Sequence, residues 1–211
     1  MSGPATNGRP ERLVVGISGS SAPQLGATVL RALQAVPSVE THLVLSAGAR
    51  RSIPAEMGVG PEALEAMADV VHRPEDLGAA VSSGSFRTLG MVIVPCSMRT
   101  LAAVATGNTT DLLTRAADVC LKERRRLVLV TRETPLNLVH LRNMETVTLA
   151  GGVVLPPVPA FYHQPRTIQD LLDHTAGKVL DLFDLPHVLY RRWTGTPESA
   201  EVREGVADAP R

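Results

Sequence analysis

The feature of this chain that most constrains its fold is a regular alternation of short apolar runs with longer segments of helical periodicity. The apolar runs predict buried strands at 12–17, 42–45, 90–94, 127–130 and 153–155. The segments between and after them predict helices at 24–36, 61–67, 99–106, 109–122, 136–149 and 168–183. Such alternation predicts an α/β protein whose parallel sheet carries helices on both faces. The periodicity is weakest over 68–88.

The composition supports one domain with a single core. Hydrophobic residues make up 44% of the 211 residues but aromatic residues only 3%, so the interior must be built mostly from Leu, Val and Ala. We expect the domain to span residues 11–193. A disordered leader is expected at 1–10 and a disordered tail at 194–211, because both ends are polar. Thr167 and Asp170 have the spacing of a capping box at the start of the last helix.

The charge balance and the cysteines limit the class of protein. The 21 basic and 21 acidic residues leave no net field to attract nucleic acid or an anionic membrane, so any anion site must be made locally. No apolar run approaches the length of a membrane span, and the N-terminus lacks the apolar core of a signal peptide. Cys96 and Cys120 are too few and too far apart for a zinc motif or a disulfide framework. We therefore expect a soluble, cytoplasmic protein with reduced cysteines and no metal site.

Hydroxyl, glycine and charged residues gather where the predicted strands end. The first four of these ends are followed, in order, by glycines and serines over 16–21, by Ser46, by the 97–100 segment and by Arg132-Glu133. The carboxyl ends of parallel strands meet at one edge of a sheet, so these groups are expected to converge on one crevice. Hydroxyls and helix N-terminal amides suit a phosphate or a polar heterocycle. Neither the dinucleotide fingerprint nor a Walker loop is present.

The charged pair after the fourth predicted strand has two interpretations. An arginine such as Arg132 can hold a phosphate through its fork of donors, and an adjacent carboxylate such as Glu133 can move a proton. The alternative is a simple ion pair between the two side chains. Because the pair follows a buried strand, we expect Glu133 to be partly buried.

A second group of cations ends the helix predicted at 109–122. Arg115 and Lys122 are two helical turns apart and share a face. Cations at a helix C-terminus also oppose the helix dipole, and we expect Arg124 and Arg125 to be solvated surface residues. Tyr162 stands in a proline-rich segment, where an anchor for the loop is the structural alternative to a ligand contact.

Longer motifs resemble one known family. They are GISGSSAPQLG, PCSMRTLAAVATG, RAADVCLKERRRLVLVTRETPLNLVHLRNM, GGVVLPPVPAFYHQPRTIQDLLDHTAGKVLDLF and the closing RRW, and they extend from about Arg12 to Trp193. Together they resemble the UbiX-type flavin prenyltransferases. The resemblance implies a Rossmann-like or flavodoxin-like three-layer αβα flavoprotein fold and a homododecamer. Such enzymes add a dimethylallyl group from dimethylallyl monophosphate to N5 and C6 of reduced FMN. They do so without a metal, and the prenylated FMN serves a UbiD-type decarboxylase.

The resemblance also implies roles for particular residues of this chain. The residues expected to contact FMN are Gly19, Ser20, Ser21, Ser46, Ser97, Met98, Arg99, Thr100 and Arg132. The residues expected to hold the prenyl phosphate are Arg115, Lys122, Tyr162 and Lys178, with Trp193 walling the prenyl site. Catalytic roles are expected for Ser21, Lys122 and Glu133, the last acting on the leaving phosphate or on the C6 proton. Some of these contacts would cross subunit boundaries.

The first loop departs from the family pattern. The family usually has GASGA followed by an aromatic residue or Ile, whereas here residues 19–23 are Gly-Ser-Ser-Ala-Pro, and Ala22 removes a backbone freedom that glycine gives. This departure leaves open an FMN-binding carrier or chaperone without transferase activity. A third alternative is a flavin-dependent decarboxylase of a peptide or pantothenate-like cysteine. It would require a histidine within 20–36, and that segment contains none.

Overall fold

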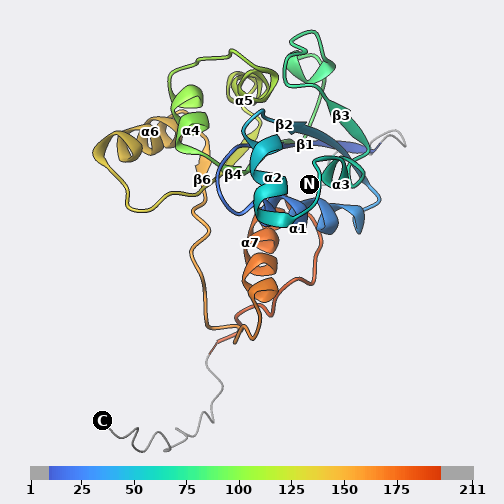
Figure 1. Ribbon diagram of the computed structural model, residues 1–211, viewed down its shortest axis with the longest axis vertical. Helices are drawn as coiled ribbons and strands as arrows, with labels where there is room; N and C mark the ends of the chain where they lie inside the picture. Colours follow the sequence, from blue (N-terminus) through green and yellow to red (C-terminus); the bar gives the residue numbers. More distant parts are fainter. Residues whose placement is uncertain (1–9, 196–211) are drawn as a thin grey trace, which may run out of the picture.

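The computed structural model describes residues 10–195 and is built around a six-stranded parallel sheet (Figure 1). The strands are β1 (Glu11–Ile17), β2 (Val39–Leu45), β3 (Val70–His72), β4 (Gly90–Cys96), β5 (Arg126–Thr131) and β6 (Val153–Val154). Their order is β3-β2-β1-β4-β5-β6, and every neighbouring pair is parallel. The chain builds outward in both directions from the β1–β4 pair. The loops after β1 and β4 therefore flank a topological switch point, where open α/β sheets bind ligands.

Helices cover both faces of the sheet, as predicted. They are α1 (Pro23–Gln34), α2 (Ala49–Met57), α3 (Glu62–Glu65), α4 (Met98–Ala105), α5 (Leu112–Lys122), α6 (Leu138–Leu149) and α7 (Ile168–Leu182). One apolar cluster joins the sheet to α1 and α7, and a second joins it to α4 and α5. Neighbouring β1 residues serve both layers, because Val15 belongs to the first cluster and Val14 to the second.

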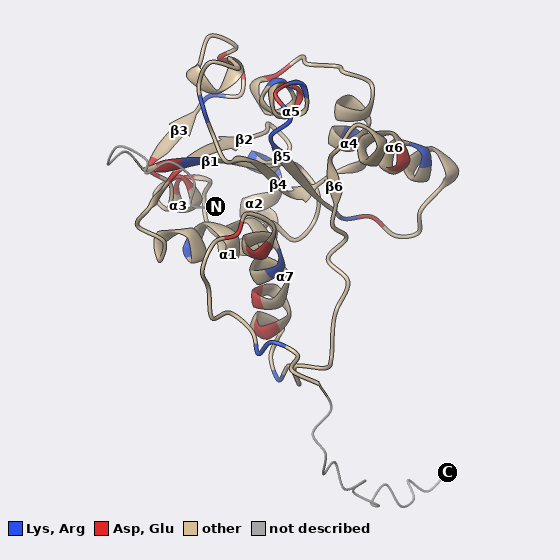
Figure 2. Cartoon of the chain, turned by 180° about the vertical axis from the view of Figure 1, so that it is seen from behind, with Lys and Arg blue, Asp and Glu red and all other residues tan. Residues whose placement is uncertain are grey.

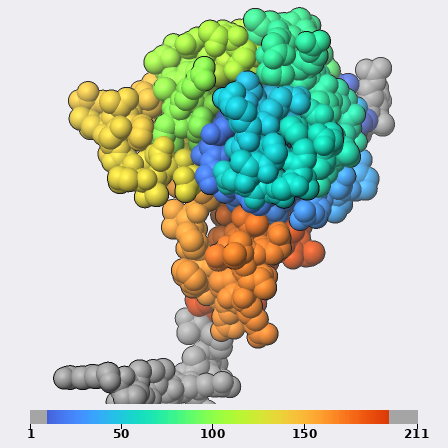
Figure 3. Space-filling view, in the orientation of Figure 1, coloured from blue at the N-terminus to red at the C-terminus, as the bar shows by residue number. Residues whose placement is uncertain are grey.

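Helix α7 and the segments on either side of it project beyond the sheet (Figures 1 and 3). The predicted capping box is confirmed, because Thr167 Oγ1 accepts a hydrogen bond from Asp170 N–H and Asp170 Oδ2 accepts one from Thr167 N–H. We call the aromatic cluster around this helix the foot of α7. It consists of Tyr162, His163, His174, Tyr190 and Trp193.

All five predicted strands are present, but β3, α2 and a short 3-10 helix at Ala80–Ser82 were not predicted. Strand β3 has three residues at the sheet edge, all partly or fully exposed, so no apolar run marks it. Helix α2 contains Pro54, and its buried residues are Ala49 and Ile53 alone, so its sequence shows little helical periodicity of apolar residues. The helix predicted from residue 136 begins at Leu138, after an Asn137 cap. Most of the expected leader and tail, residues 1–9 and 196–211, lies outside the described residues.

Two further expectations concern membranes and cysteines. Within residues 10–195, no helix combines the length and the apolar character needed to span a membrane. Cys96 and Cys120 are both free and buried. Burial raises the pKa of both thiols, that of Cys120 to about 12, so neither is a thiolate nucleophile near neutral pH. Charges of both signs are spread over the elements (Figure 2).

Candidate active site

Ser18 ties together the two loops at the switch point. Its hydroxyl donates a hydrogen bond to the Pro95 carbonyl at 2.9 Å and accepts one from Ser97 N–H at 2.7 Å. The Ser18 side chain is buried between β1 and β4, so both bonds are shielded from water. The sequence placed Ser18 at this edge but did not assign it to the site, because a serine after a strand is an ordinary turn residue.

The loops after β2 and β5 join the same edge. Ser20 Oγ donates to the Arg132 carbonyl at 3.0 Å, and Arg132 N–H donates to the Cys96 carbonyl at 3.1 Å. Ser46 N–H donates to the Ile17 carbonyl at 3.0 Å. Gly19 lies so close to the loop after β2 that a Cβ added to it would be 2.7 Å from the Gly48 Cα. The predicted convergence of the first four loops is therefore confirmed.

Helix α4 points its amino end at this crevice. Ser97 is its N-cap, and the Ser97 hydroxyl accepts a hydrogen bond from Thr100 N–H at 3.2 Å. The partial positive charge of a helix N-terminus favours an anion. A cavity of about 460 Å³ lies along α4, and Arg99, Thr100 and Asn143 contribute to its lining.

The donor set at the carboxyl edge fits FMN. The Thr131 hydroxyl at the end of β5 is buried and has no partner among the described residues. The α4 amides, the Ser97 hydroxyl and the exposed cations Arg99 and Arg132 add donors for one phosphate and for the polar atoms of a flavin. The close approach of the loops after β1 and β2 leaves backbone rather than side chains to face a ligand.

The departure in the first loop has a visible consequence. Ala22 adopts a left-handed conformation, with φ 69°, which is unfavourable for a residue that carries a Cβ. Glu56 of α2 stabilises it, because Glu56 Oε2 accepts hydrogen bonds from Ala22 N–H at 2.8 Å and from Ser21 Oγ at 2.9 Å. The sequence analysis missed Glu56 because α2 itself was not predicted.

Glu133 differs from its expected surroundings. Its side chain is exposed in this chain rather than partly buried, since the loop turns outward after β5. Its carboxylate accepts a hydrogen bond from Thr134 N–H at 3.0 Å. Between residues 10 and 195, no ion pair joins Glu133 to Arg132. The simple ion pair is therefore not formed, and both side chains extend from the crevice edge.

Arg115 and Lys122 share a face of α5, as predicted. Arg115 donates through Nε to the Ser82 carbonyl at 3.2 Å and pairs through Nη1 with Asp118 at 2.7 Å. Lys122 pairs with the neighbouring Glu123. This face is turned toward the segment that leads into β4, not toward the crevice loops.

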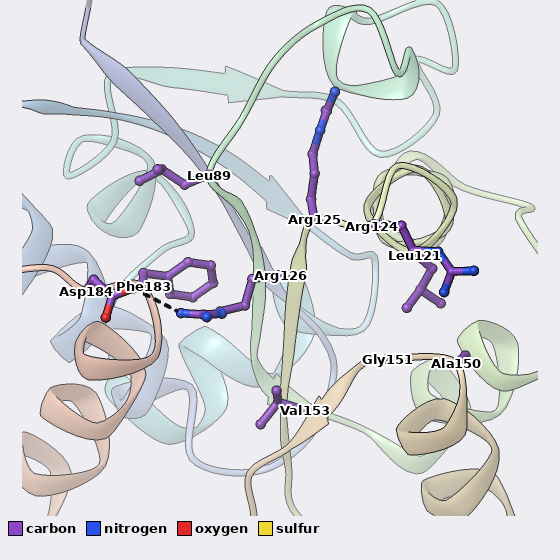
Figure 4. Close-up of a pocket in the computed structure, with 10 residues that line it drawn as sticks. All are labelled: Leu89, Leu121, Arg124, Arg125, Arg126, Ala150, Gly151, Val153, Phe183 and Asp184. Atoms are coloured by element: carbon purple, nitrogen blue, oxygen red, sulfur yellow. Dashed lines mark hydrogen bonds and ion pairs between the residues drawn. The ribbon is translucent and has the colours of Figure 1, made fainter. Parts of the chain in front are cut away.

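The cluster of arginines at the amino edge of the sheet is mostly engaged with the chain itself (Figure 4). Arg125 is half-buried and donates to the carbonyls of Gly84 and Phe86, so the expectation of a solvated side chain is wrong. Arg126 donates to the Leu182 carbonyl. A cavity of about 580 Å³ lies here, but it is at the edge opposite the crevice.

The remaining predicted substrate residues lie at or beside the foot of α7. The rings of Tyr162 and Trp193 meet edge to face, with centroids 6.1 Å apart, beside a cavity of about 330 Å³. Lys178 Nζ lies 4.0 Å from Asp181 Oδ2 on the same helix. Figures 1 and 3 place the foot of α7 and helix α5 on opposite sides of the chain. One chain thus brings the predicted FMN residues together but keeps the predicted prenyl residues in two separate groups.

Asp181 anchors the segment that follows α7. Its carboxylate accepts hydrogen bonds from Tyr190 Oη, from His187 Nε2 at 2.9 Å and from Arg192 Nη2 at 2.7 Å. Burial by itself would raise the pKa of Asp181, but the hydrogen bonds from Arg192, Tyr190 and His187 outweigh it and hold that pKa well below its usual range. Asp181 is therefore ionised throughout the neutral range.

Comparison with known proteins gives a consistent result. Residues 2–192 match the Flavoprotein family. A probable UbiX-like flavin prenyltransferase of Streptomyces sp. (strain D7) is 52% identical over 94% of this chain and 99% of the relative. The crystal structure of AnUbiX (PadA1) in complex with FMN and dimethylallyl pyrophosphate has a TM-score of 0.87 and 53% identity, covering 90% of this chain and all of that one.

A second solved structure extends the comparison. It is a dodecameric FMN-dependent UbiX-like decarboxylase from Escherichia coli O157:H7, with a TM-score of 0.85 and 47% identity over 87% of this chain and all of that one. The expected flavodoxin-like fold is confirmed by these structures together with the parallel sheet and its switch point. The chain belongs to the Flavoprotein family and, within it, to the UbiX-type flavin prenyltransferases.

Proposed function

We propose that this chain transfers the dimethylallyl group of dimethylallyl monophosphate to N5 and C6 of reduced FMN and releases prenylated FMN. The observation that carries the proposal is the crevice between β1 and β4, where hydroxyls, helix amides and two arginines surround a switch point that suits a mononucleotide. The family to which the chain belongs supports it further.

The residues at the crevice hold FMN in this proposal. The FMN contacts are Gly19, Ser20, Ser21, Ser46, Ser97, Met98, Arg99, Thr100 and Arg132. Ser21 already donates its proton to Glu56 Oε2, so its hydroxyl oxygen is left to act as an acceptor. Glu133, exposed at the crevice edge, exchanges a proton with the leaving phosphate or takes the one lost from C6.

The prenyl substrate requires a complementary set of groups. Arg115, Lys122, Tyr162 and Lys178 neutralise the phosphate as the bond between its oxygen and the allylic carbon breaks, which replaces the usual role of a divalent metal. Trp193 supplies a π face to the allylic group as positive charge develops on it. Lys122 has the further catalytic role of supporting the departing phosphate.

These groups lie on opposite sides of one chain, so several copies must complete each site. A homododecamer satisfies this requirement, and a similar structure is dodecameric. Helix α6 supports assembly because Leu138, Val139 and Leu149 are 60%, 63% and 82% exposed. Figure 3 shows α6 and the foot of α7 standing out from the body on two sides.

The proposal extends to a partner and a compartment. Prenylated FMN is a cofactor in the chemistry of UbiD-type decarboxylases, so such an enzyme is the proposed recipient of the product. The two free, buried cysteines are compatible with a reducing cytoplasm.

The test is the mass of the flavin after anaerobic incubation of the protein with reduced FMN and dimethylallyl monophosphate. We expect the mass of one added dimethylallyl unit, and we expect the same result in EDTA. Flavin that is bound but recovered unmodified would instead indicate a carrier. Preference for FAD in a fluorescence titration would contradict the FMN site.

A further inference from the structure

His174, which has no role in the proposed reaction so far, is hydrogen-bonded to Tyr162, one of the residues proposed to hold the prenyl phosphate. His174 Nε2 lies 2.9 Å from Tyr162 Oη, and the two rings meet edge to face with centroids 5.6 Å apart. His174 belongs to α7 and stands one helical turn before Lys178. The contact therefore ties Tyr162 to the helix that carries Lys178, a second residue proposed to hold the prenyl phosphate.

The surroundings of His174 fix its ring. The side chain is buried, stacks on His163 at a centroid distance of 4.7 Å, and contacts Tyr190 on another side at 4.7 Å. Burial lowers the pKa of His174, the nearby His163 and Lys178 lower it further, and Asp181 opposes them. The imidazole is consequently neutral near pH 7 and offers Tyr162 a hydrogen bond rather than a charge.

The direction of that hydrogen bond decides what Tyr162 can do. If the Tyr162 hydroxyl donated to Nε2, only its oxygen lone pairs would remain, and these repel a phosphate. If Nε2–H donates to the Tyr162 oxygen, the hydroxyl proton stays available to a phosphate oxygen. Phosphate binding at Tyr162 therefore requires the tautomer of His174 that carries its proton on Nε2.

We infer that His174 is a positioning residue, which donates Nε2–H to Tyr162 and thereby directs the tyrosine proton at the phosphate of the prenyl substrate. This inference rests on the proposed function. It assigns no contact between His174 and the substrate, since the histidine acts through Tyr162.

Two substitutions of His174 separate the hydrogen bond from packing. His174→Phe keeps a ring against His163 and Tyr190 but removes the N–H, whereas His174→Gln restores an N–H donor of similar reach. The measurements are the KM for dimethylallyl monophosphate, kcat, and the Kd of FMN followed by flavin fluorescence. We expect His174→Phe to raise that KM roughly tenfold, as for a weakened hydrogen bond to a charged group. His174→Gln should stay near the wild-type KM, and neither variant should change the FMN Kd.

A double-mutant cycle with Tyr162→Phe tests the route of the effect. In the Tyr162→Phe background, His174→Phe should have no further effect on the KM. If His174→Phe raised the KM equally in the wild-type and Tyr162→Phe backgrounds, the inference would be wrong. It would also be wrong if His174→Phe and His174→Gln raised the KM equally. Neither result would contradict the proposed function. If His174→Phe does not fold, His174→Leu takes its place in the same cycle. Wild-type protein that binds FMN but transfers no prenyl group would overturn the proposed function, and the inference with it.

Discussion

The carboxyl-edge crevice and the foot of α7 are built in different ways. At the crevice, the bonds of Ser18 and Ser20 end on backbone groups of loops that the sheet already holds in place. At the foot of α7, one side chain binds another, as Tyr162 binds His174 and Arg192 binds Asp181. The sheet thus determines the shape of the crevice, while the foot depends on the identity and protonation of individual side chains.

The largest expected effect is on the rate of prenyl transfer, at Glu133 on the edge of the crevice. Glu133→Gln should slow prenyl transfer by roughly a hundredfold or more, because acid–base help is lost, while FMN still binds. Rapid mixing with reduced FMN measures the transfer step, and fluorescence measures FMN binding. Transfer at the wild-type rate would remove Glu133 from the mechanism.

The next effect concerns how the crevice is held. Ser18→Ala leaves the Pro95 carbonyl and Ser97 N–H without their buried partner, and we expect unfolding free energy to fall by about 2 kcal/mol. Urea denaturation with an unchanged m-value measures this loss. Ser83→Ala, at an exposed position, is the matched control. Similar losses in both variants would show that Ser18 does not hold the loops.

The foot of α7 should respond to acid. The folded-state pKa of Asp181 lies below its unfolded value, so its ionised form stabilises the fold above about pH 4 and this contribution is lost as the pH falls further. Asp181→Asn should lower the unfolding free energy at pH 7 by about 1 kcal/mol, because charge-assisted hydrogen bonds become neutral ones. The same substitution should also make the unfolding free energy decline less steeply between about pH 4 and pH 2. Denaturation across this range measures both; an unchanged slope would exclude Asp181 as the source.

The smallest expected effect is a gain in stability. Ala22→Gly relieves the left-handed backbone at φ 69°, which costs about 1 kcal/mol for a residue with a Cβ, but glycine also gains freedom in the unfolded chain. We expect the free energy of unfolding to increase by roughly 0.5 kcal/mol, as measured by thermal or urea denaturation. A loss of stability would mean that the Ala22 methyl group makes a packing contribution larger than the backbone strain.

The sequence predicted the crevice better than the foot of α7. Strands such as β4 are apolar at every position, so their ends could be located and the polar residues after them assigned to one edge. The resemblance identified Tyr162 and Lys178, but nothing in the sequence indicated the bond between Tyr162 and His174, which are twelve residues apart across a proline-containing turn. Glu56 was missed for a similar reason, since its helix has an interior proline and an irregular pattern.

The placement of the predicted site residues on opposite sides of one chain has a consequence for mixed assemblies. An Arg115→Ala subunit keeps an intact Lys178, and a Lys178→Ala subunit keeps an intact Arg115. If each site draws these residues from different copies, co-assembly of two inactive variants creates some sites that carry both native side chains. Activity would then return on mixing and reassociation, as in complementation between alleles, although neither variant recovers it alone.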